Sequence, residues 1–461
     1  MSLLLVRPVT RSLLFGLLVT CESAVAVAQP LPFGSSDDPA EHTRVVWRGS
    51  QNTLDVLGGF SLIGPRWWTT ANVNASFLTR TMGVRLRSSF RVGIDTTQAG
   101  NPIGRNRPDF DEPYDILRQL EFFRIRAYNP ANLYLRFGPI ERGRLGTGHL
   151  VNFFNSSVAW DERTVGGEFM IRTHIADVAA FSDNVLLDGV VGARVALRPL
   201  TGSTDARART LELGFNAVAD VSRDDDGEPL VTGFNGDLSF AAAIIGEALF
   251  APYVSFAWYE GFGSGLAGGG EFKSENFLDV ARFTLRLGAF GDSDQFLPGY
   301  VGSFYTIQNA RSRILNTETV DVVSPEFTVG TPLADVESGN GLEFEFRALF
   351  FERFEFWWQF RRRFGSQALS ESHLRLMFQT SRLRAIFHQD RGGLRGFFTV
   401  FNDLGDQTAL NFETEYLVAG TFWVVVRARY SYERVADDVD GTHLYLVQRR
   451  FEPLAGLRIR F

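Results

Sequence analysis

The sequence predicts an all-β protein that forms a single closed antiparallel transmembrane β-barrel, with an even number of strands, about 22 and within roughly 18 to 22. Three observations predict this fold. Apolar and polar residues alternate over most of the chain, and the first thirty residues have the layout of an export signal. No later apolar run approaches the roughly 18 residues that a membrane-spanning helix needs.

The composition excludes several other classes of protein. Phe occurs 43 times and aromatic residues make up 13% of the chain, whereas a disordered chain is poor in aromatic residues. Cys21 is the only cysteine, so a disulfide scaffold is excluded. The net charge of −7, with 53 acidic residues, argues against nucleic acid as a partner because it repels phosphate. Lys273 is the only lysine, so almost every basic residue is an arginine.

The N-terminus predicts a cleaved secretory signal peptide over residues 1–28. Two arginines precede a short apolar core, and Ala26-Val27-Ala28 supplies the small residues of a cleavage site. The apolar core is about ten residues long, which is too short to span a bilayer. After the signal peptide we expect a short periplasmic segment, residues 29–51, and then the transmembrane barrel, residues 52–461.

Alternation with a period of two is the main sign of strands. It recurs in about twenty segments of roughly eight to fifteen residues. Apolar residues that share one parity include Leu54, Val56, Phe60 and Leu62; Ala71, Val73, Ala75 and Phe77; Phe283, Leu285 and Leu287; Leu342, Phe344 and Phe346; and Leu410, Phe412 and Tyr416. Successive side chains of a strand point to opposite faces, so each segment is predicted to have one apolar and one polar face.

The charged residues on the polar faces indicate which face turns inward. In a bilayer the apolar face must turn toward lipid, and the sheet must close so that no strand edge is left unpaired in hydrocarbon. Arginines and carboxylates are interspersed on the polar faces, as expected for a wet lumen with ion pairs. The candidate lumen-lining residues are Arg85, Arg87, Arg91, Arg136, Arg172, Arg194, Arg282, Arg286, Arg347, Glu343, Glu345, Glu413 and Glu415. Together with the export signal, this pattern favours an outer-membrane β-barrel.

The last segment of the chain carries a further signature. Leu457, Ile459 and Phe461 share one face, and two arginines lie on the other. This pattern resembles the terminal strand of bacterial outer-membrane barrels, in which a final aromatic residue and alternate apolar positions are recognised by the barrel insertion machinery. The resemblance implies that these three residues form the insertion signal.

The connections between strands are predicted to differ on the two sides of the membrane. Such barrels have short periplasmic turns and longer extracellular loops. We expect long extracellular loops near residues 96–115, 139–163 and 292–340. Short turns and long loops alternate along the chain only if the glycine-rich stretch 263–273 is itself a strand. Without that strand, the long 292–340 connection would fall on the periplasmic side.

The segment from Gly138 to Asn152 breaks the alternation and is both glycine-rich and partly apolar. An exposed loop rarely leaves residues such as Leu150 in solvent, so this loop either folds inward and narrows the lumen or packs against its neighbours at the rim. The constriction-loop candidates are Arg142, Arg144, His149 and Asn152. The segment, together with Tyr300 and Tyr305, is similar to segments of an uncharacterised family of bacterial outer-membrane barrels. The resemblance implies the fold and the location without an activity.

The sequence offers little that predicts catalysis or metal binding. His149, Asn155 and Ser156 supply the parts of a hydrolase site, but their order and spacing match no known motif. His373 and His388 flank the tight Thr380-Ser381 turn, so a two-residue hairpin would place them opposite each other, without a third metal ligand. We therefore expect no enzyme activity, no metal and no cofactor.

The favoured function is a porin-like channel for the passive passage of small solutes, among which the lumen arginines favour anions. Two alternatives stay open. One is a non-conducting structural or export-partner barrel whose lumen is filled by ion pairs, and the other is an outer-membrane hydrolase. We expect the protein in the bacterial outer membrane, where its partners are lipid and lipopolysaccharide, the insertion machinery and small solutes. The sequence marks no contact between subunits, so the oligomeric state is left open.

Overall fold

The structure is a computed structural model that describes residues 52–79, 81–93, 113–125, 133–223, 229–308, 312–315, 327–328, 331–351, 353–365, 367, 369–401, 407–437 and 443–461. The chain divides into two compact units, Met1–Pro30 and Leu31–Phe461. All described residues belong to the second unit. The predicted signal peptide, 1–28, and the periplasmic segment, 29–51, lie outside them.

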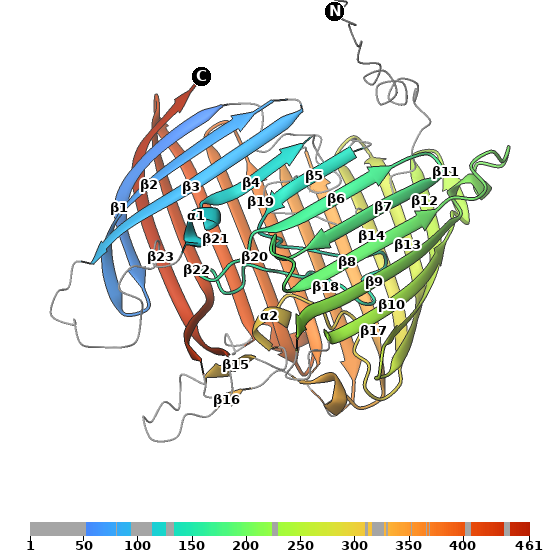
Figure 1. The fold of residues 1–461 in the computed structure, drawn as a ribbon. Helices are drawn as coiled ribbons and strands as arrows, with labels where there is room; N and C mark the ends of the chain where they lie inside the picture. The colour runs from blue at the N-terminus through green and yellow to red at the C-terminus, as the bar shows by residue number, and fades with distance from the viewer. Residues whose placement is uncertain are drawn as a thin grey trace, which may run out of the picture. The chain divides into compact units, whose positions relative to one another are not determined.

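Strands make up most of the described chain (Figure 1). The first ten are β1 (Thr53–Ile63), β2 (Arg66–Leu78), β3 (Met82–Gly93), β4 (Leu120–Ile125), β5 (Leu133–Gly138), β6 (Gly166–Arg172), β7 (Ala176–Ser182), β8 (Val190–Leu197), β9 (Glu212–Arg223) and β10 (Pro229–Ser239). The next six are β11 (Ala243–Ile245), β12 (Ala248–Tyr259), β13 (Ser264–Phe277), β14 (Ala281–Asp292), β15 (Ser312–Leu315) and β16 (Phe327–Thr328). The last seven are β17 (Gly339–Phe350), β18 (Phe354–Phe364), β19 (Ser370–Gln379), β20 (Leu383–Leu394), β21 (Thr408–Ala419), β22 (Phe422–Asp437) and β23 (His443–Arg460).

Helices in the described ranges are short. They are α1 (Asp115–Arg118), α2 (Tyr305–Gln308) and the 3-10 turns Ala208–Thr210, Leu333–Asp335 and Phe397–Phe401. None of the described helices has the length and apolar character needed to cross a membrane.

The strands close into one antiparallel ring. Each strand from β1 to β10 pairs with the next, β10 and β11 both pair with β12, and β14 passes directly to β17. The ring closes where β1 pairs with β23, with Thr53 opposite Arg460. Among the described residues the ring has 20 strands, because β11 continues β10 and the short β15 and β16 lie outside it. The predicted closed barrel is confirmed; its strand number falls within 18 to 22 and is two below the favoured 22.

The two rims of the barrel differ in their connections. At the rim where β1 begins and β23 ends, several turns are of two or three residues, such as 246–247 and 278–280; we call this the turn rim. The loops 139–165 and 293–338 leave the opposite rim, here called the loop rim. The glycine-rich stretch is indeed a strand, β13, which places 293–338 at the loop rim. Most of the loop predicted near 96–115 lies outside the described residues.

The two faces of the ring follow the alternation in the sequence. On β1, Phe60 is 53% exposed on the outer face, whereas its neighbour Ser61 is fully buried on the inner face. The C-terminal Leu457 and Ile459 also project outward, about half exposed, and Phe461 contacts Phe77 edge to face at 5.8 Å. An exposed apolar belt around a closed ring of strands requires hydrocarbon around it, as in barrels of the outer-membrane type.

Candidate functional site: the interior of the barrel

The predicted lumen-lining residues all lie at inward-facing strand positions. Arg85, Arg136, Arg194, Arg286, Arg347, Glu343, Glu345, Glu413 and Glu415 are buried, and Arg87, Arg91, Arg172 and Arg282 are partly buried. Most of their charged groups form ion pairs with residues of the same or a nearby strand. Arg194, for example, lies 2.6 Å from Asp237 and 2.9 Å from Glu212. Much of the inner wall is therefore a connected set of ion pairs.

The connection between β5 and β6, residues 139–165, runs inside the ring; we call it the inner loop. Its inward part begins and ends at a backbone bridge, in which Gly143 N donates to Phe154 O at 2.8 Å and Phe154 N donates to Gly143 O at 2.9 Å. Val151 in the same loop bridges to Val301, which belongs to the connection between β14 and β17. Two loop-rim connections therefore meet inside the barrel.

A dry apolar cluster fixes the inner loop against one half of the wall. It contains Tyr134, Ile140, Leu145, Leu150, Val151, Phe154, Met170, Ala179, Phe181, Val190, Val218, Val231, Ala257, Tyr259, Phe296, Val301, Tyr305 and Leu333. The wall residues in this set belong to β5 through β12. Their side chains face inward, where the sequence predicted a wet lumen with ion pairs, because the inner loop supplies an apolar surface against which they pack.

The constriction-loop candidates make polar contacts with the other half of the wall. Arg144 Nη1 donates to Glu345 Oε2 at 2.8 Å, and Asn152 Nδ2 donates to Gln359 Oε1 at 2.9 Å. The guanidinium of Arg142 lies over the ring of Trp357, 5.2 Å from its centroid. The structure therefore places these residues inside the ring, in contact with β17 and β18.

His149, the fourth candidate, is buried in the inner loop. Its Nδ1 lies 3.1 Å from the Ser255 hydroxyl, and its ring meets Phe296 edge to face at 5.3 Å. Burial lowers the pKa of this imidazole to about 3, and the positive charge of Arg361 acts in the same direction. His149 is therefore neutral at neutral pH.

This pKa makes a prediction about stability. The folded barrel keeps His149 neutral down to about pH 3, whereas the unfolded chain binds a proton below about pH 6.5. The unfolded state therefore binds more protons between these values, and stability should fall as the pH falls through that window. We expect His149→Gln to lose less stability than the wild type between pH 7.5 and pH 5, measured by denaturant unfolding. An equal loss in both proteins would contradict this.

The three residues considered for hydrolysis do not form a catalytic set. Ser156 Oγ accepts a hydrogen bond from Ile140 N at 3.0 Å, and Asn155 Oδ1 accepts one from Ser157 N at 2.9 Å. His149 pairs with Ser255 as described above. Within the described part of the chain, the hydrogen bonds of these side chains therefore serve the fold of the inner loop.

The expected pairing of His373 with His388 is wrong. Thr380 N donates to Leu383 O, so the two-residue turn is Ser381-Arg382 and not Thr380-Ser381. The shifted register places His373 opposite Asp390 and His388 opposite Arg375. His373 Nδ1 lies 2.8 Å from Asp390 Oδ1. No group of three or more His, Cys, Asp or Glu side chains that could hold a metal ion occurs among the described residues.

Three neighbouring cavities follow the half of the wall that the apolar cluster leaves uncovered. The largest, about 310 Å³, lies at the turn rim and is lined by residues such as Thr53, Ser381 and Arg460. The second, about 50 Å³, shares Arg85 and Arg384 with the first. We call these the rim cavity and the arginine cavity.

The third cavity, about 60 Å³, lies beyond the arginine cavity and is called the inner cavity. It shares Glu141, Trp160, Asn411 and Arg429 with the arginine cavity, and the His373 side chain also lines it. The three spaces therefore lie one after another, from the turn rim inward, between the inner loop and the wall.

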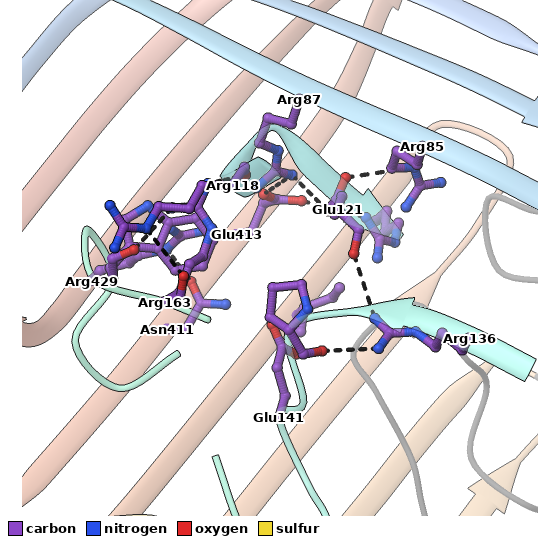
Figure 2. Close-up of a pocket in the computed structure, with 14 residues that line it drawn as sticks. Arg85, Arg87, Arg118, Glu121, Arg136, Glu141, Arg163, Asn411, Glu413 and Arg429 are labelled. Atoms are coloured by element: carbon purple, nitrogen blue, oxygen red, sulfur yellow. Dashed lines mark hydrogen bonds and ion pairs between the residues drawn. The ribbon is translucent and has the colours of Figure 1, made fainter. Parts of the chain in front are cut away.

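The walls of these cavities carry an excess of positive charge. Among the described residues, seven arginines and three glutamates line the arginine cavity: Arg85, Arg87, Arg118, Arg136, Arg163, Arg384, Arg429, Glu121, Glu141 and Glu413. Figure 2 shows the arginines gathered around the space, with Arg85 and Arg87 turned toward Glu121. The rim cavity has seven arginines and three carboxylates as well. A wall in which arginines outnumber carboxylates attracts anions.

Several of these lining residues were not predicted from the sequence. Trp160 and Arg163 lie in the inner loop, Arg118 belongs to α1, and Glu121 is the second residue of β4. Apolar and polar residues do not alternate in these non-strand segments, so no alternation shows that Trp160, Arg163 or Arg118 faces the lumen. Arg384 does occupy an inward parity and could have been included by extending the pattern of its strand. Glu121 could not, because it is the extra residue at a register shift between β3 and β4, between Leu120 opposite Leu86 and Phe122 opposite Arg85.

Comparison with known proteins shows similarity of fold only. No family model matches the sequence, and no curated protein matches it. The structure resembles Wzi of Escherichia coli, an outer membrane protein involved in group 1 capsule assembly and described as a carbohydrate-binding β-barrel. The two are 10% identical, with 88% of this chain and 84% of that chain covered and a TM-score of 0.34.

Two structures from Pseudomonas aeruginosa are also similar. The outer membrane protein OprD is 9% identical over 89% of this chain and 94% of that chain, with a TM-score of 0.30. OccK2 (OpdF), solved in complex with glucuronate, is 11% identical, with 89% of this chain and 96% of that chain covered and a TM-score of 0.30. The predicted outer-membrane type of barrel is confirmed by the closed ring of strand pairs and its exposed apolar belt.

Proposed function

We propose that this protein is a porin-like channel of the outer membrane through which small anionic solutes pass by diffusion. The observation that carries the proposal is the series of three cavities along one half of the wall, in which arginines outnumber carboxylates. An anion in such a space is attracted by the wall, and low-dielectric protein around it strengthens the attraction. The proposal assigns no catalytic step and no cofactor.

Size selection follows from the inner loop. The arginine cavity, at about 50 Å³, is much smaller than the rim cavity of about 310 Å³. Solutes that pass must therefore be small, and they must exchange contacts with several guanidinium groups on the way. Multiple weak sites of this kind allow an ion both to enter and to leave.

The proposed orientation follows the length of the connections. The turn rim faces the periplasm and the loop rim faces outward, as in barrels with short periplasmic turns. In this orientation the rim cavity opens toward the periplasm. Export by the signal peptide 1–28, recognition of Leu457, Ile459 and Phe461 by the insertion machinery, and contacts with lipopolysaccharide belong to the same proposal.

Reconstitution in planar bilayers tests the proposal. Under a salt gradient, the reversal potential of single channels should show a preference for chloride over potassium. Arg384→Gln removes one cavity charge and should reduce this preference, whereas Arg209→Gln, on an exposed turn at the turn rim, should not. Selectivity for cations in the wild type would contradict the proposed solute class.

The alternative of a non-conducting barrel has its own supporting observation. The apolar cluster and the inner loop fill the half of the lumen next to β5 through β12. A folded, inserted barrel that gives no conductance steps in the same bilayer experiment would favour this alternative and end the channel proposal.

A further inference from the structure

Two arginines in the wall of the cavities lie outside the salt bridges that the described residues form. Arg429 on β22 is 7% exposed, and Arg163 belongs to the inner loop. Neither guanidinium forms a salt bridge with a described carboxylate, and the charges of Asp161 on Arg163 and of Glu452 on Arg429 act from a longer distance. Almost all other buried arginines described here form a salt bridge, including Arg427, which lies two residues from Arg429 and bonds Glu413 at 2.8 Å. Part of the excess positive charge of the arginine cavity therefore lies at this pair.

Both guanidinium groups lie over one aromatic ring. The central carbon of Arg163 is 4.4 Å from the centroid of Trp160, and that of Arg429 is 3.2 Å from it. Their described hydrogen bonds go to neutral groups: Arg163 donates to Trp160 O at 2.9 Å and Arg118 O at 2.5 Å, and Arg429 donates to Asn411 Oδ1 at 3.1 Å. Figure 2 shows Arg163, Arg429 and Asn411 together at one end of the cavity.

The nearby carboxylates are already engaged with other arginines. Asp161 accepts hydrogen bonds from Arg450 at 2.6 and 2.9 Å, and Glu162 and Asp115 both pair with Arg118. Burial, together with the charges of Arg118 and Arg87, lowers the pKa of Arg163 to about 10, against the opposite effect of the Asp161 carboxylate. A contact with an aromatic ring stabilises a cation less than a carboxylate does. The pair therefore has charge and donors available for an anion from the cavity.

We propose that Arg163 and Arg429, positioned by Trp160 between the arginine cavity and the inner cavity, bind the oxyanion group of a small solute. The chemical class is a carboxylate or a phosphate, because guanidinium groups bond both through paired N–H donors. The adjoining spaces of about 50 and 60 Å³ suit a small group and not a large ligand. The solute's route to the site rests on the proposed anion passage.

The test measures binding without relying on conductance. Purified barrel in detergent, in a buffer free of other oxyanions, is titrated with inorganic phosphate and separately with acetate by calorimetry, and its thermal unfolding is followed. We expect at least one of the two anions to bind and to raise the unfolding temperature. The anion that binds distinguishes a phosphate site from a carboxylate site.

Variants locate the binding. We expect Arg429→Gln and Arg163→Gln each to weaken binding about tenfold or more, since each removes charge-assisted hydrogen bonds. Without ligand, Arg429→Gln should keep or raise the unfolding temperature, because it removes a buried charge that lies outside the described salt bridges. The matched control Arg427→Gln should lower it, because Glu413 then loses the shortest of its ion pairs, at 2.8 Å, and keeps only the longer ones to Arg87 and Arg384.

Each result has a defined meaning. If neither phosphate nor acetate binds, or if Arg429→Gln binds as the wild type does, the oxyanion site is overturned. A barrel that conducts chloride but binds neither anion would overturn this site and leave the proposed function intact. A barrel that binds an oxyanion at this pair but does not conduct would keep the site and end the channel proposal.

Discussion

Replacement of Glu345 by alanine is expected to destabilise the barrel by about 3–5 kcal/mol, the cost of leaving buried charges unpaired. Glu345 is 1% exposed and binds three groups at once. It accepts hydrogen bonds from Arg144 at 2.8 Å and from Trp357 Nε1 at 2.9 Å, and it lies 3.0 Å from Arg347. Denaturant unfolding of the reconstituted barrel measures the loss.

Two further variants isolate the cause. Arg144→Met combined with Glu345→Leu removes both charges of the loop-to-wall pair and should recover part of the stability, as apolar replacement of buried ion pairs often does. Glu260→Ala, in an exposed turn at the loop rim, removes the same charge without a buried partner and should change stability little. If Glu345→Ala were no more costly than Glu260→Ala, the ion pairs would not be what fixes the inner loop.

The alternation of the strands was predictable because lipid imposes it. A residue such as Phe60 must face hydrocarbon while Asp55, on the other parity, must not, so the sequence itself records the two faces of each strand. The even ring and the inward direction of the charged residues follow from the same constraint. The strand number was harder to predict, because short segments such as β15 and β16 form strands without joining the ring.

The filling of the lumen could not be predicted in the same way. Tyr134 and Phe181 face inward because residues of the inner loop cover them, and that contact joins segments that no local pattern relates. The strand arginines suggested the anionic preference that we propose, but nothing in the sequence indicated the Arg163–Trp160–Arg429 cluster. It joins a loop to a strand more than 260 positions away (429 − 163 = 266), and only the closed ring brings them together.

Replacement of residues 144–153 by Asn-Gly is expected to raise single-channel conductance severalfold. Gly143 and Phe154 already form an antiparallel bridge, so a two-residue Asn-Gly connection can close the shortened loop as a tight hairpin. The change removes Leu145, Leu150 and Val151 from the lumen while every strand of the ring remains. Shortening the exposed tip 185–187, which lies outside the cavities, is the matched control and should leave conductance unchanged.

Selectivity should change together with conductance in the loop replacement. In a wider lumen, a passing ion lies farther from the arginines of the wall, and charges more than about 10 Å apart are largely screened at 0.1 M salt. We therefore expect the preference for anions to weaken as the conductance increases. An increase in conductance with the full preference retained would assign selectivity to the cavity wall alone, and unchanged conductance would show that the inner loop does not limit the passage.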